Sequence, residues 1–271
     1  MKLSEHPVLI KPSSEKIKFL VQKHGADFVA KLLQDREDKI QAEKLDPYRH
    51  GYEPKHWADA DVLLSQFDEV CVMGGNRAGK TEWAAKKVMQ ILTSKPDARV
   101  WCLHTTSQSS IQMQQNVIWK YMPAELKTAK KTKITNISYS QKNGFSDNTF
   151  ILPNKSQCFF MNYAQKRDVI EGGEVDLIWC DELVPLDWIE TLRYRIVTRF
   201  GKLITTFTPI TGYSSVVKEY VSGAKILEHR ESPLLPDNIN VNGCPRGHMP
   251  YKAQSYVRPA GVMWFHSELN P

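Results

Sequence analysis

The stretch Gly74-Gly75-Asn76-Arg77-Ala78-Gly79-Lys80-Thr81 decides the fold, because it matches the pattern G-x-x-x-x-G-K-[ST] of a phosphate-binding loop. Glycines let such a loop curl until successive backbone N–H groups point at phosphate oxygens, and a following helix adds its positive N-terminus. In this chemistry the Lys80 amine reaches the β- and γ-phosphates, and the Thr81 hydroxyl is a ligand for Mg²⁺. We therefore predict that all eight residues bind a nucleotide phosphate chain.

The flanking sequence supports this motif, which would otherwise occur by chance in roughly 1% of chains of this length. Residues 69–73 form a short apolar run that ends at the glycines, as a buried strand would. Residues 82–92 have apolar side chains at helical spacing. A strand, a glycine-rich turn and a helix in this order are the context that the motif requires.

A second signal is the apolar run 175–180, which is followed directly by Asp181 and Glu182. A continuous apolar run is typical of a buried parallel strand, and ligands bind at the carboxyl ends of such strands. Asp181 can hold Mg²⁺ through water, and Glu182 can orient and deprotonate an attacking water. Many strands end in acidic residues, so the Asp-Glu pair indicates a nucleotide site only because a phosphate loop precedes it in the chain.

A third signal is the strand-like run 202–207, which ends in hydroxyl residues. Thr206 and Thr208 are candidates for sensing the γ-phosphate and coupling its loss to movement. The alternative is that Thr is simply a good strand former.

Apolar runs alternate with helical spacing from about residue 48, which favours an α/β P-loop NTPase fold with a mostly parallel sheet flanked by helices. Further strands are expected at 99–103 and 225–227, and helices at 108–121 and 214–220. A β-hairpin insert is expected where residues 134–139, 149–152 and 157–162 surround the turn Asn143-Gly144.

We divide the chain into three parts. Residues 1–47 are an N-terminal helical segment, in which Ser14 caps a first helix and Gly25 breaks it. Residues 48–230 are the P-loop ATPase core. Residues 231–271 are expected to be irregular, apart from a last strand at 262–265, and to lead toward a domain outside the chain.

The composition excludes several other classes of protein. Hydrophobic residues make up 41% and charged residues 24% of the chain, which are ordinary values for a folded protein. No window resembles a membrane helix or a signal peptide. The five cysteines are widely spaced and read as reduced and buried, which favours a reducing cytoplasm. A net charge of +6 permits a polyanionic partner without demanding one.

Several motifs in a fixed order resemble the ATPase domain of tailed-phage large terminase subunits, the DNA-packaging motors. They are the phosphate loop, the stretch Asn162 to Arg167, Glu171-Gly172, the run ending in Asp181-Glu182, and the stretch Thr206 to Gly212. The resemblance covers roughly residues 50–230. It implies an additional-strand catalytic-glutamate core of the RecA-like kind, ATP and Mg²⁺ as cofactors, and catalysis by Lys80 and Glu182.

The same resemblance implies partners and a location. They are viral double-stranded DNA, a portal protein, a small terminase subunit and further copies of the chain in a ring, all in the host cell cytoplasm and away from membranes. Relatives also carry a C-terminal nuclease with an acidic metal cluster. We expect that nuclease to be absent from this chain, because the acidic residues after Glu182 do not fall on a second run of strands.

Basic residues supply weaker candidates. Such terminases often carry Arg where this chain has Asn76, so Arg77 is our candidate for a catalytic arginine in cis. The candidates for an arginine finger in trans are Arg193, Arg195 and Arg199, whose alternative is a solvated helix face. The candidates for DNA contact are Lys127, Lys130, Lys131 and Lys133, since a basic run can meet phosphates but is more often just solvated.

Two alternative functions stay open at this stage. A helicase-like DNA-dependent ATPase shares the Asp-Glu pair and a hydroxyl-Pro coupling strand, but it would need a second core of similar size. A nucleotide-binding assembly subunit would need no catalysis, and the intact Lys80, Thr81, Asp181 and Glu182 argue against it.

Overall fold

The computed structural model describes residues 12–182, 184–209, 214–222, 224–231, 248–255 and 259–265. The chain forms two compact units, Met1–Glu53 with Tyr121–Thr128 and Pro54–Lys120 with Ala129–Pro271. Each unit is considered by itself. Among the described residues, no helix is both long and apolar enough to cross a membrane.

The first unit is helical. It contains α1 (Ser14–His24), α2 (Ala26–Leu45), α3 (Pro47–His50) and α8 (Ala124–Lys127). The cap of α1 is Ser13 rather than Ser14, because the Ser13 hydroxyl accepts a hydrogen bond from the amide of Lys16 at 3.2 Å. Gly25 separates α1 from α2 with a φ of 89°, a value that side chains disfavour.

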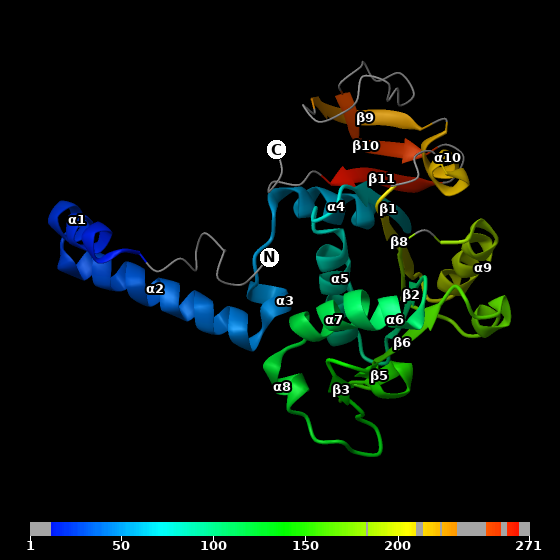
Figure 1. The fold of residues 1–271 in the computed structure, drawn as a ribbon, viewed down its shortest axis with the longest axis horizontal. Helices are drawn as coiled ribbons and strands as arrows, with labels where there is room; N and C mark the ends of the chain where they lie inside the picture. The colour runs from blue at the N-terminus through cyan, green and yellow to red at the C-terminus, as the bar shows by residue number, and fades with distance from the viewer. Residues whose placement is uncertain are drawn as a thin grey trace. The chain divides into compact units, whose positions relative to one another are not determined.

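The second unit is built on a large, mostly parallel sheet. Among the described residues its strand order is β5-β6-β2-β7-β8-β1-β11-β10-β9 (Figure 1). The strands are β1 (Glu69–Gly74), β2 (Arg99–His104), β5 (Thr149–Ile151), β6 (Gln157–Asn162), β7 (Leu177–Asp181), β8 (Lys202–Phe207), β9 (Lys225–Glu231), β10 (His248–Ser255) and β11 (Ala260–Phe265). The pairs between β6 and β11 in this order are parallel, and β5, β10 and β9 join antiparallel to their neighbours.

The order of the central strands confirms the predicted fold class. Strand β8 lies between β1, which carries the phosphate loop, and β7, which carries the Asp-Glu pair. This extra strand is the feature expected of an additional-strand core. All three strands are parallel, so their carboxyl ends share one edge of the sheet.

Helices cover both faces of this sheet. On one face α9 (Leu186–Val197) and α10 (Ser215–Val221) pack on Cys71, Met73 and their neighbours in a hydrophobic cluster. On the other face lie α5 (Lys80–Ser94) and α4 (Lys55–Gln66), and Figure 1 shows α5 and α9 on opposite sides of β8. Alternate residues of each strand therefore face different helices, which explains the continuous apolar runs.

Two expectations about the sheet were wrong. Strand β6 pairs in parallel with β2, so residues 157–162 belong to the main sheet and not to an insert. The segment after residue 230 is not merely irregular, because it contains β10 and β11, and β11 pairs in parallel with β1. The sheet of the core thus extends beyond the boundary predicted at 230.

The predicted hairpin itself is small. It consists of β3 (Tyr139–Ser140) and β4 (Gly144–Phe145) around the expected Asn143-Gly144 turn. Of residues 134–138, Asn136 makes an isolated bridge to Ile151. The helix expected at 108–121 is divided into α6 (Ser107–Ser109), the π-helix Ser110–Gln115 and α7 (Asn116–Tyr121).

Candidate nucleotide-binding site

The predicted phosphate loop joins the end of β1 to the start of α5. Gly74 lies in the sheet opposite Phe265, and a Cβ on it would lie 2.5 Å from the Phe265 carbonyl oxygen. Gly79 has a φ of 84°, and a Cβ there would lie 3.1 Å from the Trp57 ring. Both positions therefore require glycine for a structural reason, in addition to the approach of a phosphate.

Lys80 is the first residue of α5, and its amine contacts the loop that precedes it. Its amine donates hydrogen bonds to the carbonyl oxygens of Gly74 at 3.0 Å and Gly75 at 2.9 Å, and to Thr208 Oγ1 at 2.9 Å. Desolvation lowers the pKa of this amine, and the nearby charges of Glu182 and Asp181 oppose that shift. A buried cation held by exchangeable carbonyl contacts is suited to take phosphate oxygens instead.

Asp181 ends β7 and faces the start of α5. Its Oδ2 lies 3.4 Å from the hydroxyl of Thr81, and its Oδ1 accepts a hydrogen bond from Thr206 Oγ1 at 2.7 Å. The indole of Trp179 in turn donates to Thr206 Oγ1 at 2.8 Å. Burial raises the pKa of Asp181 to about 7, and the Thr206 hydroxyl opposes the shift.

These oxygens fit Mg²⁺. A buried carboxylate whose charge is disfavoured gains from a cation, and carboxylate and hydroxyl oxygens are hard ligands of the kind that Mg²⁺ prefers. Mg²⁺ usually keeps several waters and takes phosphate oxygens as well, so few protein ligands suffice. Among the described residues, no group of three or more His, Cys, Asp or Glu side chains is placed to hold a metal.

Glu182 directly follows Asp181. It is half-buried, and its backbone is strained. Its φ is 64°, and its amide donates to the Thr206 carbonyl oxygen at 2.7 Å. Burial raises the pKa of its carboxyl, while the charge of Lys80 and the amide of Thr208 lower it. A positive φ in a residue with a side chain is uncommon and costs backbone energy, as residues at functional sites often do.

The predicted coupling residues Thr206 and Thr208 contact the Asp181 carboxylate and the Lys80 amine, respectively. Thr206 binds Asp181 as described above. Thr208 Oγ1 accepts from Lys80 and lies 3.4 Å from Asn76 Oδ1 in the loop. The remaining residues of that motif, Ile210 to Gly212, lie outside the described residues.

His104 lies beside Asp181, although no motif in the sequence indicated it. It ends β2, is 4% exposed, and its Nε2 lies 3.9 Å from Asp181 Oδ2. Burial lowers its pKa to about 4, so the ring is neutral near pH 7. The feature of the sequence that could have indicated His104 is its place at the end of a strand. A polar residue at the end of a parallel strand next to β7 must share the ligand-binding edge.

Arg77 lies on the exposed part of the loop, with a φ of 65°. Arg193 and Arg195 of α9, and Arg199 just after it, lie at the opposite edge of the sheet from the loop, where the strands begin. Arg193 pairs with Glu69 at 3.1 Å and Arg199 with Asp176 at 2.9 Å. A six-residue strand is roughly 20 Å long, so these residues cannot reach the phosphate site of their own chain.

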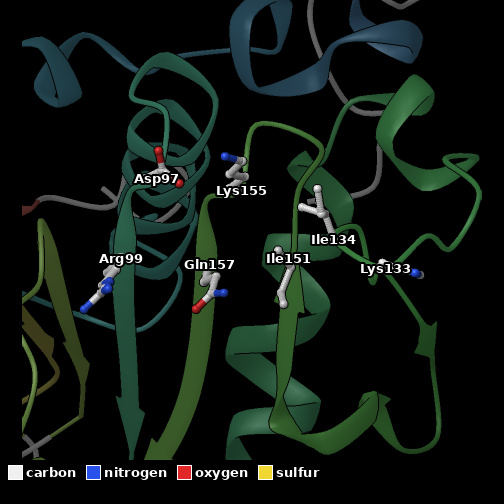
Figure 2. A pocket seen from close by; sticks show the side chains of 7 residues that line it. All are labelled: Asp97, Arg99, Lys133, Ile134, Ile151, Lys155 and Gln157. Carbon is white, nitrogen blue, oxygen red and sulfur yellow. The ribbon is translucent and has the colours of Figure 1, made fainter.

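The four candidate lysines are divided between the two units. Lys127 belongs to the first unit, whereas Lys130, Lys131 and Lys133 are exposed residues of the second. A hollow of about 310 Å³ lies at the starts of β2 and β6, and Figure 2 shows the side chains that line it. Its lining residues are Asp97, Arg99, Lys133, Ile134, Ile151, Lys155 and Gln157.

The sheet order and the loop define the class of this protein as a P-loop nucleotide-binding fold with an additional central strand. Residues 71–233 match the family described as "Terminase large subunit, T4likevirus-type, N-terminal". The chain therefore belongs to the family of large terminase subunits, as its motifs indicated, and this membership supports a general role in viral DNA packaging.

Solved structures similar to this chain carry related names. The large terminase ATPase domain of Thermus phage P74-26 is 17% identical over 67% of this chain and 73% of that one, with a TM-score of 0.48. A large terminase from a thermophilic bacteriophage is 16% identical over 57% of this chain and 39% of that one, with a TM-score of 0.42. No curated protein matches the chain significantly.

Proposed function

We propose that this chain hydrolyses ATP with Mg²⁺ and that hydrolysis powers the movement of viral double-stranded DNA into a procapsid. One observation carries the proposal. Lys80, Thr81, Asp181 and Glu182 come from distant parts of the chain and meet at one edge of the sheet: Thr81 lies 3.4 Å from Asp181, and the charges of Glu182 and Asp181 act on the Lys80 amine. Membership of the terminase family supplies the DNA-packaging context.

The residues divide the chemistry between them. When ATP binds, the Lys80 amine exchanges loop carbonyls for the β- and γ-phosphates. Thr81 and Asp181 would hold Mg²⁺, which supplies charge neutralisation at the phosphates. Glu182 orients and deprotonates the attacking water, a task that its raised pKa favours because a base works best near the operating pH.

Strand β8 offers a way to pass on the state of the nucleotide. Thr208 holds the Lys80 amine, and Thr206 holds the Asp181 carboxylate. An amine that exchanges the loop carbonyls for phosphate oxygens can stay bonded to Thr208, so its shift toward the phosphates would be passed to the end of this strand. We infer that β8 links the site to the chain that follows it.

The test of the function is to measure nucleotide binding and phosphate release by the purified chain with and without Mg²⁺. We expect Mg²⁺-dependent binding of ATP, slow release of phosphate by the chain alone, and faster release with portal, small subunit and double-stranded DNA. Stimulation by single-stranded DNA alone would favour a helicase-like ATPase. Binding without turnover under all these conditions would favour an assembly subunit.

The same proposal covers the partners and the location. The chain acts in the host cell cytoplasm as a homo-oligomeric ring on a portal protein, with a small terminase subunit to select DNA. We expect no cleavage of DNA by this chain, because Asp181 and Glu182 are committed to the nucleotide. Incubation with plasmid and Mn²⁺ tests this, and cleavage that Asp181→Ala removes would contradict it.

A ring allows an arginine of one copy to act at the site of the next. Among the three candidates, only Arg195 makes no ion pair within the described part of the chain. We therefore expect that mixing Lys80→Ala chains with Arg195→Ala chains restores phosphate release, since each supplies what the other lacks. Failure of every pairing of Lys80→Ala with Arg193→Ala, Arg195→Ala or Arg199→Ala would contradict a finger among these residues.

The hollow in Figure 2 is our candidate for DNA contact in the second unit. Arg99, Lys133 and Lys155 are exposed there, and no ion pair holds any of them within the described residues. Such cations are free to replace counterions on a phosphate backbone. Lys133 is the one member of the predicted lysine set that lines this hollow.

The double variant Lys133→Glu/Lys155→Glu is expected to bind double-stranded DNA more weakly. The slope of log affinity against log salt concentration should fall by about 2, because each lost phosphate contact removes about 0.9 from it. The control is Lys225→Glu, an exposed lysine of β9 at the other edge of the sheet. An equal loss of affinity and of slope in the control would show that net charge alone, and not this hollow, contacts DNA.

A further inference from the structure

We propose that His104 is a positioning residue that holds the Asp181 carboxylate in place for Mg²⁺. The inference rests on the proposed function, because it assigns to Asp181 the role of metal ligand. It concerns a residue that none of the sequence motifs includes.

The sheet places His104 next to Asp181. Strands β2, β7 and β8 are adjacent and parallel, with Leu103 opposite Cys180 and Asp181 opposite Thr206. His104 is therefore opposite Asp181, and the side chains of His104, Asp181 and Thr206 form a row across the ends of the three strands. Asp181 lies in the middle of this row, with Thr206 on one side and His104 on the other.

The contacts of Asp181 agree with this row. Thr206 Oγ1 donates to Oδ1 at 2.7 Å, which fixes one oxygen from the β8 side. The other oxygen, Oδ2, faces Thr81 Oγ1 at 3.4 Å and His104 Nε2 at 3.9 Å. Oδ2 is thus the oxygen that points toward the metal ligand of α5, and His104 is its neighbour from the β2 side.

The tautomer of His104 follows from its other nitrogen. The backbone amide of Thr105 donates to Nδ1 at 2.8 Å, so Nδ1 is an acceptor and carries no proton. The Thr105 hydroxyl also lies 3.0 Å from Nδ1. In a neutral imidazole the proton is then on Nε2, which is the nitrogen that faces Asp181. A donor is therefore aimed at the carboxylate.

The surrounding backbone is held firmly. The carbonyl oxygen of Leu103 accepts from the side-chain amide of Gln114 at 3.2 Å and from the Tyr163 hydroxyl at 3.5 Å. The same hydroxyl lies 3.4 Å from the carbonyl oxygen of Asp181. Tyr163 thus ties the end of β2 to the end of β7, which fixes the backbone that carries His104 relative to the backbone that carries Asp181.

A separation of 3.9 Å is too long for a hydrogen bond, so His104 does not bind Asp181 in the way that Thr206 does. It orients Oδ2 by presenting a buried N–H dipole toward it. Groups that orient a metal ligand from outside the metal shell are typically worth about 10–100-fold in metal affinity. The expected effect of losing Nε2 is accordingly on Mg²⁺ and not on the nucleotide itself.

Two substitutions separate the nitrogens of the ring. In His104→Asn the amide reaches the place of Nδ1, so the contact with Thr105 is kept and the donor toward Asp181 is lost. In His104→Gln the amide reaches the place of Nε2, so the donor is kept. The matched control is Ser107→Ala, because Ser107 accepts from Asn162 at 2.8 Å and lies outside the row.

The measurement is the affinity of the full chain for a fluorescent ATP analogue, in excess EDTA and over a titration of Mg²⁺. We expect His104→Asn to raise the Mg²⁺ concentration for half-maximal binding by about 10–100-fold, with unchanged affinity in EDTA. We expect His104→Gln to stay within about 3-fold of the unaltered chain, and Ser107→Ala to match it. Thermal unfolding confirms that each variant is folded.

Two results would contradict the inference, and a third would contradict the proposed function on which it rests. If His104→Asn has the Mg²⁺ dependence of the unaltered chain, the inference is wrong. It is also wrong if the affinity falls equally in EDTA and in Mg²⁺, because His104 would then support only the fold of the site. If the unaltered chain shows no Mg²⁺-dependent binding at all, the proposed function itself fails.

Discussion

Replacing Glu182 with Gln is expected to lower the rate of ATP hydrolysis by about 10²–10⁴-fold and to leave nucleotide affinity unchanged. The carboxylate is half-buried, and burial raises its pKa, which favours its action as a proton acceptor. The amide of Gln fills the same space but cannot accept that proton. Phosphate release, measured with saturating ATP and Mg²⁺ in the presence of the packaging partners, gives the rate.

The control for this change is Glu174→Gln, which alters an exposed carboxylate in the segment before β7. It should leave both rate and affinity as they are. A Glu182→Gln chain that keeps hydrolysis within twofold would remove Glu182 from the role of base. A chain that loses nucleotide affinity to the same extent as rate would give Glu182 a binding role instead.

Replacing Lys80 with Ala is expected to reduce nucleotide affinity by about 100-fold or more and to reduce turnover to background. A hydrogen bond to a charged group is worth about 1.5–3 kcal/mol, and the amine can make more than one to the phosphates. The loss also leaves Asp181 and Glu182 without the cation that opposes their raised pKa values.

Equilibrium binding of a fluorescent nucleotide and phosphate release together check this expectation. Lys120→Ala is the matched control, because Lys120 pairs with Glu82 at 2.8 Å and does not line the loop. Unchanged turnover in Lys80→Ala would disprove the assignment of residues 74–81 as the phosphate loop.

The phosphate loop and the Asp-Glu strand could be predicted because their signals are local. Glycines, a lysine and a hydroxyl at fixed spacing need no knowledge of the rest of the chain, and neither does an apolar run that ends in carboxylates. Thr206 and Thr208 were predicted for the same reason. The hydrogen bonds of these two residues to Asp181 and Lys80 add geometry to that prediction.

His104 and the C-terminal strands could not be placed in the same way. Pairing between β1 and β11 joins residues nearly 200 positions apart, and no local pattern specifies the partner of the run 262–265. Likewise, the nearness of His104 to Asp181 follows from strand order, which the sequence does not state. The basic run Lys127 to Lys133 is divided between the two compact units, and its contact with DNA stays a prediction.

The pairing of β11 with β1 also bears on how the protein is made. The family match ends at residue 233, whereas the strand that covers one side of the phosphate-loop strand is formed by Ala260–Phe265. During synthesis, β1 can therefore be hydrogen-bonded at both of its edges only after residues 260–265 have been made. A fragment cut at the end of the family match would leave that edge open to other chains, and exposed edge strands favour aggregation. The phosphate loop is thus an early motif in sequence that is completed late in folding.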